Sequence, residues 1–157
     1  MAPVNASWHR WIYASVADHL TVGAALIPVE LRIEFTSKRS AAWKAAATKA
    51  EATLTGPMTK ETNPGLFNVW FDVFIVLSSK ADSNNYGHVD AAGGLANLLD
   101  QCILIKDYGD TGLLTVGSIR PRSDANENVE VKHLKPKEGD DLIHSTISAR
   151  YFGLFTE

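Results

Sequence analysis

Two segments of the chain carry long β-strand patterns, and they constrain its fold more than any other feature. From Pro28 to Phe35, apolar residues alternate with charged ones, which is typical of a strand with one dry face and one charged face. From Leu66 to Leu77, every second residue is apolar, while the residues between them mix polar and large apolar side chains. When extended, this second segment would be about 40 Å long, close to the diameter of a compact domain of this size. We therefore expect part of it to contact another molecule.

The length and charge of the chain fit one domain that does not bind nucleic acid. The 157 residues suffice for one hydrophobic core and are too few for two. The 15 basic and 18 acidic side chains give a net charge of −3, without the basic stripe that a nucleic-acid-binding protein needs. The single cysteine, Cys102, excludes an internal disulfide and suits a reducing cytoplasm or a virion assembled there. The start of the chain lacks the apolar core of a signal peptide, and Asp72 interrupts the longest apolar run, so we expect no membrane segment.

A first amphipathic helix is predicted near the start of the chain. Asn5 or Ser7 can cap it, and Gly23 is a natural stop. Its apolar residues recur at helical spacing, and they are Trp8, Trp11, Ile12, Val16 and Leu20. Tryptophans at this spacing usually belong to a core, so we assign Trp8 and Trp11 to packing.

A second helix is predicted from Val89 to Ile103. Its apolar side comprises Val89, Ala92, Leu95, Ala96, Leu99, Cys102 and Ile103. Gly93 and Gly94 each cost a helix about 1 kcal/mol relative to alanine. Their presence predicts a close approach of this helix to a sheet or a neighbour, and the alternative is a merely weak helix. Cys102 is expected to be a small buried apolar residue.

The region between the two long strands is ambiguous. The alanine and lysine residues of Ser40 to Leu54 favour a helix, although the threonines in and beside it also allow a β-hairpin arm. We favour the helix. The glycine and proline residues from Thr55 to Gly65 predict a turn-rich loop that projects from the body of the protein. We therefore expect a projecting arm or loop around residues 40 to 65.

Three more strands are predicted in the second half of the chain. They run from Leu113 to Ile119, ended by Pro121, from Val129 to Leu134, and from Leu142 to Phe155. The whole chain, residues 1 to 157, is thus expected to form a single α+β domain. Its sheet should be mainly antiparallel or mixed, with long strands packed against two or three helices.

The residues that could support catalysis form no recognisable spacing. Asp110-Thr111-Gly112 resembles an aspartic-protease loop, but that chemistry needs two carboxylates, and this triplet lies in a turn. The five histidines fall on five segments, and His88 and Asp90 would face different sides of a helix. We interpret His88 as a polar cap at a helix start. The sequence therefore predicts no enzyme activity, no cofactor and no metal site.

A set of candidate interface residues takes the place of an active site. Trp70 shares a strand face with Asp72 and Phe74, and Asp72 is either solvated or paired with a basic residue such as Arg150. Aromatic residues are common anchors of interfaces. Beyond these four, the candidates are Trp43 in the alanine-rich segment and Met58, Lys60 and Glu61 in the predicted loop.

The order of elements resembles a known family. An amphipathic helix, the strand Pro28 to Phe35, a loop-rich excursion, the strand Phe67 to Leu77, a helix from Val89 and a closing strand from Ser145 to Tyr151 follow one another. This order is similar to that of the tail-terminator and related neck proteins of tailed bacteriophages. The alanine-rich insertion from Ser40 to Leu54 and an extra strand from Asn128 to Leu134 depart from the smaller members.

The resemblance implies a structural virion protein that assembles in the host cytoplasm. It implies a homo-oligomeric ring, usually a hexamer, that ends the tail tube and binds the tail-tube and head-tail connector proteins. Nucleic acid and membrane are not among the expected partners. Two alternatives remain open, namely another connector or tube component of the virion, and a small α+β enzyme or ligand-binding domain with an unrecognised pocket.

Overall fold

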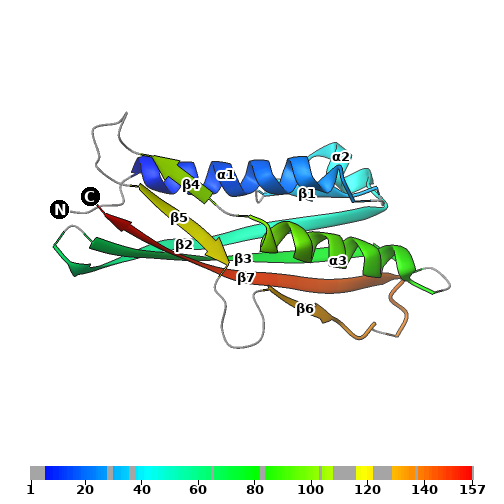
Figure 1. The fold of residues 1–157 in the computed structure, drawn as a ribbon. Helices are drawn as coiled ribbons and strands as arrows, with labels where there is room; N and C mark the ends of the chain where they lie inside the picture. The colour runs from blue at the N-terminus through cyan, green and yellow to red at the C-terminus, as the bar shows by residue number, and fades with distance from the viewer. Residues whose placement is uncertain are drawn as a thin grey trace.

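A seven-stranded sheet carries the fold, and the helices lie along one of its faces (Figure 1). The structure, a computed structural model, describes residues 6–27, 30–35, 38–64, 66–81, 84–102, 104–107, 116–121, 129–136 and 138–156. The helices in this part are α1 (Ala6–Ala24), α2 (Ala41–Ala45) and α3 (Tyr86–Asp100). The strands are β1 (Arg32–Glu34), β2 (Thr48–Asn63), β3 (Leu66–Lys80), β4 (Leu104–Asp107), β5 (Val116–Pro121), β6 (Val129–His133) and β7 (Leu142–Thr156).

The sheet is mixed but almost entirely antiparallel. Its order is β1-β2-β3-β7-β5-β4, and β6 pairs with β7 beside β5. Only β1 and β2 are parallel to each other among the described pairs. The predicted fold class is confirmed, because one α+β domain holds a mixed sheet packed against three helices.

The core lies between the helices and the inner face of β3. The side chains of Val69, Phe71, Val73, Ile75 and Leu77 are fully buried, as the period-2 pattern predicted. They meet Ile12, Val16 and Leu20 of α1, which are fully buried as the helical spacing predicted. The side chains of Trp8 and Trp11 lie outside the described part of the structure, and α1 ends one residue beyond Gly23.

The first predicted strand is much shorter than its pattern suggested. Only Arg32 to Glu34 form β1, and residues 28 and 29 lie outside the described part. The reason is the register, because Arg32 lies opposite Lys49 and β2 begins at Thr48. Residues before β1 therefore have almost no strand to pair with. The alternation itself holds, since Leu31, Ile33 and Phe35 pack against the core.

The predicted helix from Ser40 to Leu54 is wrong over most of its length. Only Ala41 to Ala45 are helical, where the Ser40 hydroxyl accepts a hydrogen bond from the Trp43 backbone nitrogen. From Thr48 onward the chain is strand β2, so the β-hairpin alternative describes this region better. Thr48, Ala50 and Ala52 are buried at alternate positions, and pairing with β3 overrides the helical propensity of the alanines.

The predicted loop from Thr55 to Gly65 is also wrong, because β2 continues to Asn63. The turn signal Gly56-Pro57 marks a cis peptide bond and an irregularity in the ladder between Thr55 and Met58. Gly56 has φ +107°, a value that favours glycine. Residues 58–64 are all exposed, so this end of the β2–β3 hairpin projects from the core as an arm.

The second predicted helix is confirmed as α3, which begins and ends three residues earlier than predicted. Ala92, Leu95, Leu99 and Cys102 are buried as expected, but Val89 is 48% exposed and Ile103 lies outside the described part. A Cβ at Gly94 would lie 2.9 Å from Ile27, which confirms the close approach predicted there. At Gly93 the prediction is wrong, because a Cβ there would meet no atom within 4 Å.

The three strands predicted in the second half of the chain agree with the structure where it describes them, whereas β4 was not predicted. β6 and β7 match the predicted segments closely. β5 begins at Val116, and residues 108–115 lie outside the described part, as does the triplet Asp110-Thr111-Gly112.

Candidate interaction surface

The outer face of the sheet, opposite the helices, carries a mixed surface over β2, β3 and β7. Residues paired directly across an antiparallel ladder share a face. Trp70 of β3 lies between Met58 and Phe152, and Asp72 lies between Thr55 and Arg150. In the next row toward the α3 end, Phe74 lies between Thr53 and Ser148. We call this surface the open face.

Large apolar side chains on the open face remain accessible. Met58 and Phe74 are each 44% exposed, and Phe152 is 39% exposed. Trp70 is half-buried between its neighbours. Both long helices lie on the opposite side of the sheet (Figure 1). Large exposed apolar side chains gathered on one face are a signature of interaction sites.

An ion pair crosses the centre of the open face. Arg150 donates from Nε to Asp72 Oδ1 at 2.8 Å and from Nη2 to Asp72 Oδ2 at 3.3 Å. The paired alternative for Asp72 is thus confirmed. Because the side chains are 56% and 35% exposed, water screens the pair and its value is at most about 1 kcal/mol. Its geometry nevertheless holds Arg150 over the strand.

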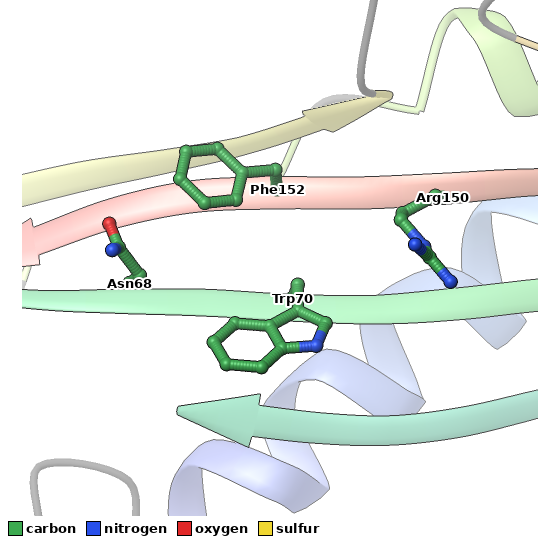
Figure 2. A pocket seen from close by; sticks show the side chains of 4 residues that line it. All are labelled: Asn68, Trp70, Arg150 and Phe152. Atoms are coloured by element: carbon green, nitrogen blue, oxygen red, sulfur yellow. The ribbon is translucent and has the colours of Figure 1, made fainter. Parts of the chain in front are cut away.

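A shallow hollow of about 190 Å³ lies beside this ion pair. Asn68, Trp70, Arg150 and Phe152 line it, two residues from β3 and two from β7 (Figure 2). Figure 2 shows the Trp70 and Phe152 rings on either side of the groove between these strands. A hollow lined by two aromatic rings, an amide and an arginine suits a protruding side chain of another protein.

Of the other predicted interface residues, Lys60 pairs with Asn68 at the edge of this hollow, whereas Trp43 lies on α2, away from it. Lys60 and Glu61 are exposed on the projecting hairpin arm. Trp43 packs α2 onto β2, since its Nε1 donates to the Ala50 carbonyl oxygen at 2.8 Å. Arg39 and Lys49 lie over its ring at 4.8 and 4.9 Å, a cation–π arrangement within the chain. The structure therefore brings together Met58, Trp70, Asp72, Phe74 and Arg150, but not Trp43.

Sequence reasoning missed a hydrogen-bonded chain of histidines and serines that runs from buried His88 to exposed His133. His88 Nδ1 lies 2.7 Å from Ser79 Oγ, and His88 Nε2 lies 2.7 Å from Ser145 Oγ. Ser145 Oγ in turn lies 2.7 Å from His133 Nδ1. The interpretation of His88 as a helix cap is wrong, because its side chain is buried and bonded to two strands. The sequence did contain one sign of this chain, because serines occupy inward-facing positions of β3 and β7 and a buried hydroxyl needs a hydrogen-bond partner.

A second hollow of about 160 Å³ lies next to this chain, at the junction of α3, β6 and β7. Its polar lining includes His88, His133, His144 and Ser145. In the described part of the structure, no group of three or more His, Cys, Asp or Glu residues is placed to hold a metal ion.

Cys102, just after α3, and Tyr151 of β7 form a buried pair in the core. Burial raises the pKa of the Cys102 thiol from 9.0 to about 11, although a hydrogen bond with Tyr151 opposes the shift. Burial also raises the pKa of Tyr151, and nearby Cys102 adds to the effect. The Tyr151 hydroxyl donates to the Leu99 carbonyl oxygen at 2.6 Å. Both groups are protonated at neutral pH, and Cys102 is the buried residue that the sequence predicted.

Comparisons with known proteins bear on the fold alone. No protein-family model matches the chain, and no curated protein matches it in sequence. One similar solved structure, whose designation states no activity, is 14% identical, with a TM-score of 0.55. The similarity covers 91% of this chain and 93% of that one. Within the described residues, no helix is both long and apolar enough to cross a membrane.

Proposed function

We propose that the chain is a structural protein of a tailed-bacteriophage virion that forms a hexameric ring at the neck. There it ends the tail tube and joins the tail to the head connector. The observation that carries the proposal is the open face, where Trp70, Phe74 and Phe152 are held accessible on rigid paired strands. Aromatic anchors on a preformed surface are typical of protein–protein contacts.

The projecting hairpin arm supports the same proposal. A closed ring needs two different surfaces on each protomer, because its contacts are head-to-tail. The open face is one such surface, and the tip of the exposed arm, residues 61–64, is a second that lies beyond it. The order of elements, which is similar to that of tail-terminator proteins, is the reason for preferring a phage neck over other rings.

The proposal is tested by mass and by location. Native mass spectrometry of the purified protein should give a hexamer, and electron microscopy should show rings. Immunogold labelling of particles of the phage that encodes the chain should mark the head–tail joint. Label along the whole tail would favour a tube subunit, and label on tailless heads would favour a connector. Absence of the protein from purified particles would contradict the proposal.

A second candidate function is a small hydrolytic or ligand-binding domain. The specific observation is Ser145, whose hydroxyl lies 2.7 Å from two imidazoles beside a hollow. A serine next to a histidine base is the arrangement of a nucleophile. Here, however, Ser145 is fully buried, which favours a structural role. Labelling of Ser145 by a fluorophosphonate, lost in a His88→Gln variant, would establish the hydrolytic candidate.

A further inference from the structure

Strand β6 leaves an edge of the sheet open. It pairs with β7 on one side, and no other described strand pairs with it. Figure 1 shows β6 at the border of the sheet. The residues from Glu130 to His133 are exposed. An edge strand of this kind presents unpaired backbone N–H and C=O groups, which are a template for another strand.

The register shows which backbone groups face outward. The Leu134 nitrogen donates to the His144 carbonyl oxygen at 3.0 Å, and His133 lies opposite Ser145. Hydrogen-bonded and non-hydrogen-bonded pairs alternate along an antiparallel ladder. Glu130 and Lys132 therefore direct their backbone groups toward β7. Val129, Val131 and His133 direct theirs toward the open edge.

The charges on β6 are arranged symmetrically about Val131. Glu130 and Lys132 lie on the outer face of the sheet, with Lys132 Nζ 3.2 Å from Glu130 Oε1. Their side chains are 51% and 65% exposed. Reversing the strand exchanges the two charges, so β6 is complementary to an antiparallel copy of itself. Glu130 of each copy would lie opposite Lys132 of the other.

We propose that two copies of the chain pair through β6, antiparallel, about a two-fold axis at Val131. Val131 then exchanges backbone hydrogen bonds with its own copy, and Val129 exchanges them with His133 at both ends. The two Glu130–Lys132 contacts fall at non-hydrogen-bonded positions, where opposed Cα atoms are only about 4.5 Å apart. All outward backbone groups of the strand are satisfied in this register, and the two sheets become one.

This contact does not rest on the proposed ring. It uses the edge of the sheet rather than the open face, and a two-fold contact closes at two copies. Charged residues on an edge strand can also have the opposite role, which is to prevent the strand from pairing with another chain. The two uses predict opposite results for charge reversal.

Sedimentation equilibrium at low salt over a range of protein concentrations tests the proposal. The wild-type protein should associate reversibly through this contact. Glu130→Lys or Lys132→Glu should each raise the dissociation constant by about tenfold or more, because both opposed pairs become like-charged. The controls are Glu30→Lys and Lys44→Glu, which make the same charge changes at exposed positions near β1, at the other edge of the sheet, and should leave the association unchanged.

Mixing the two variants gives the sharpest result. The Glu130→Lys protein has an all-basic β6 and the Lys132→Glu protein an all-acidic one, so an equimolar mixture should recover wild-type affinity as a heterodimer. Val131→Pro should abolish pairing without disturbing the β7 ladder, because it removes an outward-facing N–H.

Three results would overturn the proposal. These are a wild-type protein that is a single copy at every concentration, a Glu130→Lys protein that associates as tightly as wild type, and a mixture that stays dissociated. Trp70→Ala separates this contact from the ring, since it should disrupt the ring and leave β6 pairing intact. Loss of the ring alone would thus count only against the proposed function.

Discussion

Gly23 of α1 and Leu98 of α3 touch so closely that a Cβ at position 23 would lie 2.2 Å from Leu98 Cδ2. The two long helices contact each other at this point. Leu98 is itself buried, so it has little room to move aside. The glycine is therefore required by the packing of two helices rather than by the end of one.

Replacing Gly23 by alanine is expected to destabilise the protein by about 1 to 3 kcal/mol through overpacking, despite a gain in helix propensity. Gly93→Ala is the matched control, because a Cβ there meets no atom within 4 Å. It should stabilise the protein by up to about 1 kcal/mol. Urea unfolding measures both, and equal stability of the two variants would contradict the contact between α1 and α3.

Replacing Ser145 by alanine is expected to lower the free energy of unfolding by about 1 to 3 kcal/mol. The variant removes one hydrogen bond from His88 and one from His133, and His88 is buried. Ser148→Ala, on the opposite face of the same strand, should change stability by less than about 0.5 kcal/mol. A Ser145→Ala protein as stable as the Ser148→Ala protein would show that the bridge contributes nothing.

Stability is expected to fall as the pH rises from 9 to 11. The unfolded chain releases the Cys102 proton near the ordinary pKa of 9.0, whereas the folded chain holds it to about 11. The unfolded state then binds fewer protons, so this contribution is complete below pH 9 and is lost as the pH rises. The difference between these two pKa values corresponds to a total loss of about 3 kcal/mol in the free energy of unfolding.

The slope of unfolding free energy against pH between 9 and 10 checks this prediction. Tyr151, whose pKa is also raised, adds to the loss only above its ordinary value of 10.0. In Cys102→Ala the slope below pH 10 should flatten, whatever the change in overall stability. An unchanged slope would assign the alkaline loss to other groups.

Replacing Trp70 by alanine is expected to weaken ring assembly more than it lowers the melting temperature of the protomer. An aromatic anchor typically contributes more than about 1 kcal/mol to an interface. Val76→Ala is the control, because Val76 lies on the same strand and face, three rows away from Trp70. Assembly is measured by native mass and melting by calorimetry. Equal losses of assembly and stability would place Trp70 in the protomer's own packing.

Local periodicity was enough to predict the elements that form the body of the protein. In β3 and α1, each side chain's face follows from its position along the element, so the apolar face that holds Phe71 and the helical face that holds Val16 could be read from spacing alone. The pairing of Asp72 with Arg150 was one of two readings, and the register of β3 on β7 decided between them.

Elements that depend on distant partners could not be predicted in this way. Ala50 and Ala52 have helical propensity, yet they lie in β2 because β3 offers them a ladder and a buried face.

The sequence by itself determined a single α+β domain with one long, two-faced strand, because that information lies in the alternation of neighbouring residues. Only the tertiary structure decided that His88, Ser145 and His133 form one hydrogen-bonded chain, and that β6 ends as an open edge. His88 and Ser145 are 57 residues apart, and neither carries a local signal of the other. Contacts of this kind arise from strand order and register, which are properties of the assembled sheet.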